Sequence, residues 1–139
     1  MPKREPMIKP VLYVFVNRGL GMSSGKIAAQ VAQATAGALN MSDPEAVKDW
    51  WGEGAGQHHP TYVMLGRDAG HLRDIQSYLE ARDFKTFLMI DEGLTEIDPH
   101  TATALGVEIV DKADGNVSNT FQSFELYRDT VKVTMEFER

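Results

Sequence analysis

The chain has 139 residues, 42% of them hydrophobic and 24% charged, which suits a single water-exposed domain with a packed core. It contains no cysteine, which excludes disulfides and thiol catalysis, and no apolar run near the ~20 residues that span a bilayer. We therefore expect one cytoplasmic domain over residues 1–139. The formal charge of −6 argues against a general nucleic-acid binder but allows a local basic patch.

The first predicted elements are a basic arm over residues 1–10 and a strand that follows it. The run VLYVFV at 11–16 is short, apolar and rich in β-formers, which is typical of a buried central strand. After a glycine-rich turn, Ser23 or Ser24 can cap a helix that continues through the alanine-rich segment. The apolar stripe of this helix has the spacing of one helical face and consists of Ile27, Val31, Ala34 and Ala38.

Helices and strands then alternate along the chain. The patterns predict helices at 43–54 and 71–83, and strands at 61–65, 84–91 and 103–110. The tail at 128–139 alternates apolar and polar residues, which indicates a half-exposed extra strand. Alternation of this kind implies an α/β sheet with crossover connections, whose ligands usually bind beyond the carboxyl ends of the strands.

The turn after the first strand resembles a phosphate-binding loop, because a Gly-Lys pair precedes the helix. The P-loop pattern requires glycine five residues before that pair and serine or threonine directly after it. Leu20 and Ile27 occupy those two positions, so the magnesium-binding hydroxyl is missing. Nucleotide hydrolysis is therefore not expected, and Lys26 needs another explanation.

Lys26 stands in the first turn of its helix, where a cation opposes the macrodipole. A charge placed there indicates an anionic partner, which could be a phosphate, a developing oxyanion or a carboxylate. Gln30 and Gln33 follow on what the spacing predicts to be the same helical face, and Asp91 follows the third strand with Thr95 four residues later. The residues alone leave open that Lys26 is solvent-exposed and that Asp91 caps a turn.

Two segments together resemble the peptidyl-tRNA hydrolase 2 family. They are NRGLGMSSGKIAAQVAQA, beginning at residue 17, and DEGLTEIDPHTATALG, beginning at residue 91. Members of that family carry L-x-M-x-x-G-K-x-A-A-Q after the first strand and later D-A-G-x-T-x-[IV]-x-P-x-x-x-T. The matching residues are Leu20, Met22, Gly25, Lys26, Ala28, Ala29, Gln30, Asp91, Gly93, Thr95, Ile97, Pro99 and Thr103. The resemblance covers about Val11 to about Tyr127.

The resemblance implies an α/β fold with a mixed, roughly four-stranded sheet flanked by helices on both faces. It also implies hydrolysis of the ester between a peptide and the 3′ ribose of tRNA, without metal or organic cofactor, and often a homodimer. By motif position, the catalytic group would be Lys26, Asp91 and Thr95, which we expect to converge in one solvent-open cleft. We expect the substrate, the 3′ acceptor end of peptidyl-tRNA, to be bound by Arg18, Gln30, Gln33 and Thr103.

The residues fit direct attack of water on the ester, because no activated nucleophile such as a G-x-S-x-G serine is evident. Asp91 can orient the water and Lys26 can stabilise the oxyanion or keep Asp91 ionised. Several departures from the family remove positive charge or add negative charge: Gln33 replaces a histidine, Glu92 an alanine, and Thr61 and Leu65 basic residues. The alternative is therefore a non-catalytic tRNA- or protein-binding module that retains the fold.

Overall fold

The computed structural model describes residues 5–52, 59–91 and 100–128. Its strands are β1 (Pro10–Asn17), β2 (Thr61–Gly66), β3 (Thr86–Asp91), β4 (Thr101–Val107) and β5 (Val110–Asp111). Its helices are α1 (Ser24–Met41), α2 (Pro44–Trp51), α3 (Ala69–Glu80) and α4 (Gly115–Phe121), with a short 3₁₀ turn, η1, at Arg18–Leu20. No helix in these described ranges is long and apolar enough to cross a membrane.

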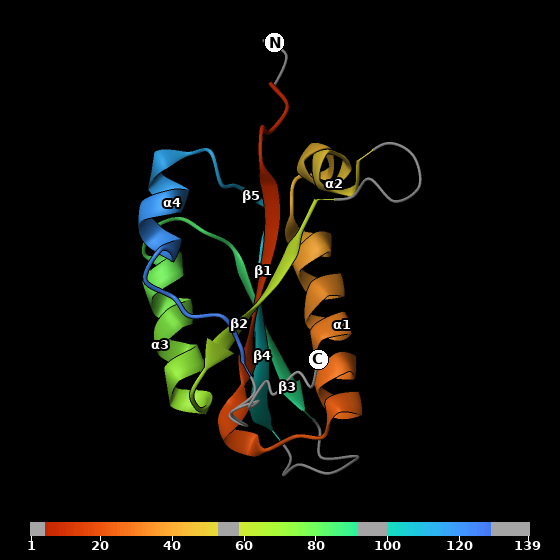
Figure 1. Cartoon of the computed structure of the whole chain (residues 1–139), viewed down its shortest axis with the longest axis vertical. Coiled ribbons are helices and arrows are strands. Elements are labelled where there is room, and N and C mark those ends of the chain that lie inside the picture. The colour runs from red at the N-terminus through yellow and green to blue at the C-terminus, as the bar shows by residue number, and fades with distance from the viewer. Residues whose placement is uncertain (1–4, 53–58, 92–99, 129–139) are drawn as a thin grey trace, which may run out of the picture.

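The sheet is mixed, and its main strand order is β2-β1-β4-β3. β1 and β2 are parallel, whereas β4 is antiparallel to both β1 and β3, and the short β5 pairs with the beginning of β1. Helices α1 and α2 cover one face and α3 and α4 cover the other (Figure 1). The predicted α/β class is confirmed, and η1, β5 and α4 were not predicted. The tail strand predicted at 128–139 lies, except for Arg128, outside the described residues.

β1 is buried along its whole length because both faces of the sheet are covered, which explains its continuous apolar run. Its side chains alternate between two cores. Leu12, Val14 and Val16 pack in the cluster that α1 and α2 supply, while Val11, Tyr13 and Phe15 pack in the cluster supplied by α3 and α4. The central strand thus fixes the positions of both helical layers.

Small residues allow α1 to lie very close to the sheet. A methyl group added at Gly106 of β4 would stand 2.6 Å from the Ala34 carbonyl oxygen, and one at Gly37 would stand 2.4 Å from the Phe87 ring. The fully buried residues of α1 are accordingly Gln30, Ala34 and Ala38. The predicted apolar stripe does face the sheet: Ala34 and Ala38 are fully buried, and Ile27 and Val31 are half-buried and pack against the same cluster. The buried row also includes Gln30, which the stripe did not contain.

The residues of α1 that pack most closely against the sheet are spaced four apart. This row therefore continues from Ala38, Ala34 and Gln30 back to Lys26. That end of the helix follows the carboxyl end of β1. The strand directions bring the end of β2, the end of β3 and the start of β4 to the same edge of the sheet. The topology therefore places Lys26 beside the carboxyl ends of the strands, where open α/β sheets usually bind their ligands.

We predict that Gly106→Ala destabilises the protein, because the added methyl group has to push the Ala34 backbone away from β4. The expected loss is about 1–3 kcal/mol, the usual range for overpacking a core. Gly115→Ala is the matched control, since its added methyl group meets no atom within 4 Å. Urea melts of both variants measure the difference; equal stability of the two would contradict the close packing of α1 on the sheet.

Candidate active site

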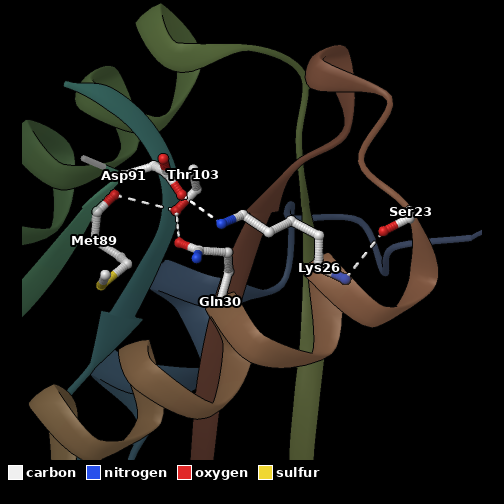
Figure 2. A network of polar contacts seen from close by, with 6 residues as sticks. All are labelled: Ser23, Lys26, Gln30, Met89, Asp91 and Thr103. Atoms are coloured by element: carbon white, nitrogen blue, oxygen red, sulfur yellow. Dashed lines mark hydrogen bonds and ion pairs between the residues drawn. The ribbon is translucent and has the colours of Figure 1, made fainter. Parts of the chain in front are cut away.

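Lys26 and Asp91 form an ion pair at the carboxyl edge of the sheet (Figure 2). The Lys26 ammonium nitrogen lies 2.6 Å from Asp91 Oδ2, and the two side chains are only 11% and 5% exposed. The predicted convergence of these two residues is confirmed. The position of Lys26 in the first helical turn indicated an anionic partner, and that partner is the Asp91 carboxylate. The pair is more covered than the solvent-open cleft expected from the sequence.

Local structure on both sides fixes the two partners. Ser23 caps α1 by accepting a hydrogen bond from the Lys26 backbone N–H, 3.2 Å away, which sets the first turn that carries the lysine. Asp91 is the last residue of β3, and its carbonyl oxygen accepts a hydrogen bond from the His100 N–H. Both charged side chains therefore leave backbone segments that are themselves hydrogen-bonded.

Gln30 stands one turn after Lys26 and faces Thr103 of β4. The Thr103 hydroxyl donates to Gln30 Oε1, and it also lies 3.3 Å from the Met89 carbonyl oxygen (Figure 2). Gln30 is 3% exposed and Thr103 is fully buried. Their sequence-based assignment to substrate binding stays a prediction, and their burial favours a role in fixing α1 against the sheet beside the ion pair.

A β-bulge explains why Thr103 reaches Gln30. Met89 is opposite Ala104 and Ile90 is opposite Ala102, so Thr103 is an extra residue with no partner on β3. Ala104 packs in the α1 cluster and Ala102 in the α3 cluster, whereas residues two apart on a regular strand share one face. The extra residue sends a second consecutive side chain, that of Thr103, to the α1 side, which is how bulges redirect side chains near functional sites.

The other predicted site residues are placed differently. Arg18 is half-buried in η1, at the same edge of the sheet as the ion pair. Gln33 is exposed on α1, so the expectation that it shares a face with Gln30 was wrong; three residues of helix rotate it away from the sheet. Thr95 lies in 92–99, outside the described residues, and its catalytic role stays a prediction.

Three residues at this edge were given no functional role by the sequence patterns: Asn17, Arg67 and His71. Arg67 follows the end of β2, just as the Lys26 turn follows β1, so the strand-end rule could have found it. Its N–H donates to His71 Nδ1 at 2.9 Å. Burial, and then the nearby Arg67 charge, lower the pKa of His71, so its imidazole is neutral at pH 7.

Within the part of the chain that the structure describes, no group of three or more His, Asp or Glu side chains could hold a metal ion. The chemical groups that converge at the edge are an ammonium, a carboxylate and the N–H groups at the start of α1. Together they can orient a water molecule and bind developing negative charge.

Comparisons with known proteins place the sequence in one family. The family model described as "Peptidyl-tRNA hydrolase PTH2" matches residues 10–127, which include both motifs. A peptidyl-tRNA hydrolase of Methanopyrus kandleri is 37% identical over 75% of this chain and 93% of its own, and one of Thermococcus onnurineus is 34% identical over 73% and 90%. The mitochondrial peptidyl-tRNA hydrolase 2 of Bos taurus is 29% identical over 76% of this chain and 62% of its own.

We predict that Lys26 and Asp91 are energetically coupled. Lys26→Met leaves a buried carboxylate without its cation and should cost roughly 3 kcal/mol, the low end for breaking a buried pair because Lys26 keeps some exposure. In the double variant Lys26→Met/Asp91→Asn the buried charge is gone, so it should be more stable than Lys26→Met alone.

The matched control is Lys48→Met, which breaks the exposed Lys48–Glu45 pair and should change stability by less than about 0.5 kcal/mol. Denaturant melts of the single and double variants provide the full double-mutant cycle. Additive losses for Lys26 and Asp91 would show that the ion pair contributes nothing to the fold.

Proposed function

The chain belongs to the peptidyl-tRNA hydrolase PTH2 family, and we propose that it is an esterase that releases the peptide from peptidyl-tRNA. The bond broken joins the peptide carbonyl carbon to the 3′ ribose oxygen of tRNA. Water supplies the hydroxyl group of the new carboxylic acid and the proton of the freed ribose hydroxyl. The observation that carries this proposal is the buried Lys26–Asp91 pair at the carboxyl edge of the sheet.

In the proposed mechanism Asp91 orients the attacking water. One carboxylate oxygen, Oδ2, faces Lys26. The other can accept a hydrogen bond from water and draw off its proton as the bond to the carbonyl carbon forms. The nearby ammonium keeps the carboxylate in its charged, proton-accepting form, since an opposite charge at hydrogen-bond distance favours ionisation.

Lys26 has a second task in this mechanism, which is to bind the oxyanion. An ammonium has three N–H donors, and Asp91 occupies one of them. A second donor can face the ester carbonyl, where negative charge develops. The first turn of α1 adds its own positive potential at the same place. Gln30 and Thr103 hold this turn against β4, and Thr95 is the proposed hydroxyl donor of the 92–99 segment.

We further propose that the tRNA approaches this edge of the sheet through Arg18 and Arg67. Arg18 follows β1 and Arg67 follows β2, and these strands are parallel neighbours, so both cations lie beside the carboxyl ends. Lys9, in the basic arm that precedes β1, lies at the opposite end of that strand, nine residues and roughly 30 Å from Arg18. A homodimer and a cytoplasmic site of action complete the proposal, both taken from the family resemblance and the chain's composition.

The alternative, a non-catalytic binding module, is less well supported. A protein that only binds tRNA has no need of a carboxylate beside the cation, because the carboxylate repels phosphates. The buried pair is also expensive to maintain, since two charges leave water to form it. Both facts favour chemistry at the pair over simple electrostatic binding.

We predict that Asp91→Asn and Lys26→Ala each lower kcat/KM for a purified N-acylaminoacyl-tRNA by ~10²-fold or more, the usual scale for one oriented group. Lys26→Arg keeps the charge and the fold but should not restore full activity, because a guanidinium differs in shape and reach. Release of the labelled N-acylamino acid is measured below the melting temperature of every variant. Wild-type rates in Asp91→Asn would reject the proposed mechanism, and tRNA binding without hydrolysis by the wild type would favour the binding module.

We also predict that the salt dependence of tRNA binding separates Arg18 from Lys9. Arg18→Gln should weaken binding and reduce the slope of log K against log salt by about one unit, as expected for one lost phosphate contact. Lys9→Gln is the matched control, with the same charge change at the opposite end of β1, and should leave the slope unchanged. Equal effects of the two variants would contradict the proposed tRNA approach.

A further inference from the structure

Asn17 is a buried polar residue to which the proposed mechanism gives no task. It is the last residue of β1, its side chain is 2% exposed, and it lies at the same edge of the sheet as the ion pair. Its Nδ2 donates to the Ala102 carbonyl oxygen of β4 at 2.9 Å. The side chain therefore joins the central strand to β4 directly beside the bulge at Thr103.

The side chain makes this contact in place of a more common one. Asn17 occupies the N-cap position of η1, where asparagine usually accepts a hydrogen bond from the N–H groups of the next turn. Here no side-chain cap bond forms. The other side-chain atom, Oδ1, is buried without a hydrogen-bond partner among the described residues, an arrangement that costs about 1–3 kcal/mol. An apolar residue would avoid that cost, so packing alone does not explain an asparagine here.

The backbone pairing explains what the side chain replaces. β1 and β4 pair at Val14–Gly106, Phe15–Leu105 and Val16–Ala104, and this pairing stops where the extra residue Thr103 enters β4. The next β4 carbonyl beyond the bulge is that of Ala102, and the Asn17 amide reaches it. Asn17 thus continues the β1–β4 connection across a gap that backbone groups do not bridge.

We propose that Asn17 is a positioning residue for the hydrolysis, holding the bulge of β4 so that both halves of the site keep their geometry. The hydrogen bond from the Asn17 side chain to the Ala102 carbonyl oxygen is called the clamp below. Ala102 is opposite Ile90, the neighbour of Asp91, so the clamp limits movement of the end of β3 that carries Asp91. Ala102 also precedes Thr103, whose hydroxyl holds Gln30 one turn from Lys26. The inference rests on the proposed function for its catalytic consequence, while the clamp itself can be tested without any activity.

The test compares Asn17→Asp with Asn17→Ala. In its ionised form, the carboxylate that Asn17→Asp introduces has no proton to donate and places a negative oxygen against the Ala102 carbonyl. In its protonated form, the same carboxyl group donates through its O–H and restores the clamp. Burial and the adjacent Ala102 carbonyl oxygen raise the pKa of such a carboxyl group, whereas the cations Arg18 and Arg67 at this edge lower it and Lys26 is paired with Asp91. At a position only 2% exposed the effect of burial should prevail, so the restoration should occur in mildly acidic solution. Asn119→Asp, which makes the same change on the exposed side of α4, is the matched control.

At about pH 8 we expect kcat of Asn17→Asp to fall by ~10-fold or more while KM changes little, because the reacting groups are displaced and the tRNA contacts are kept. As the pH is lowered toward about 5, the rate of Asn17→Asp relative to the wild type should recover, as the buried carboxyl takes up its proton. Asn17→Ala should lose activity by a similar factor at every pH. A pH-independent loss in Asn17→Asp, or full activity in Asn17→Ala, would overturn the proposal.

Stability provides a readout that does not depend on hydrolysis. A group whose pKa is raised on folding stabilises the fold below its unfolded pKa, and this contribution disappears as the pH rises through the folded pKa. The melting temperature of Asn17→Asp should therefore approach that of the wild type at low pH, whereas that of Asn119→Asp should follow the wild type throughout. If the melts behave this way but the wild type does not hydrolyse peptidyl-tRNA, the clamp stands and the proposed function fails; flat melts overturn the clamp itself.

Discussion

The buried ion pair between Lys26 and Asp91 is the constraint that the rest of the site depends on. Each charge alone is unfavourable where it stands: the cation opposes the helix dipole, and the carboxylate is removed from water. Together they compensate each other, but only if the first turn of α1 and the last residue of β3 meet at hydrogen-bond distance. The remaining features of the fold near this edge can be understood as the means of holding these two backbone segments together.

Close packing provides the first of these means. The glycines and alanines between α1 and the sheet place the helix axis so near β4 that Gln30 is drawn into the interface one turn from Lys26. The bulge in β4 provides the second, because it turns Thr103 toward that glutamine. An enzyme that uses water as its nucleophile depends on such pre-organisation, since it forms no covalent intermediate that would hold the reacting groups in place.

A protein with negative net charge can still bind the proposed polyanionic substrate, because its cations are concentrated at one edge of the sheet. Arg18, Lys26 and Arg67 all follow the carboxyl ends of strands at one edge, together with the positive starts of α1 and α3. A local field of this kind can attract a phosphate backbone although the formal net charge is −6. The charges of Lys26 and Asp91 neutralise each other, so beyond the site the attraction for a phosphate backbone comes from Arg18, Arg67 and the two helix starts.

The sequence by itself determined the α/β class, the elements β1, α1, α2, β2, α3, β3 and β4, and the convergence of Lys26 with Asp91, because periodicity, caps and strand-end positions are local signals. The family motifs added the chemistry. Only the tertiary structure showed that Gln30 belongs to the buried row of α1, since an apolar pattern does not include a glutamine and cannot register how closely Gly106 lets the backbones approach. It alone placed Lys9 away from Arg18, revealed the bulge at Thr103 and gave Asn17 its contact, because each of these depends on pairing between residues far apart in the chain.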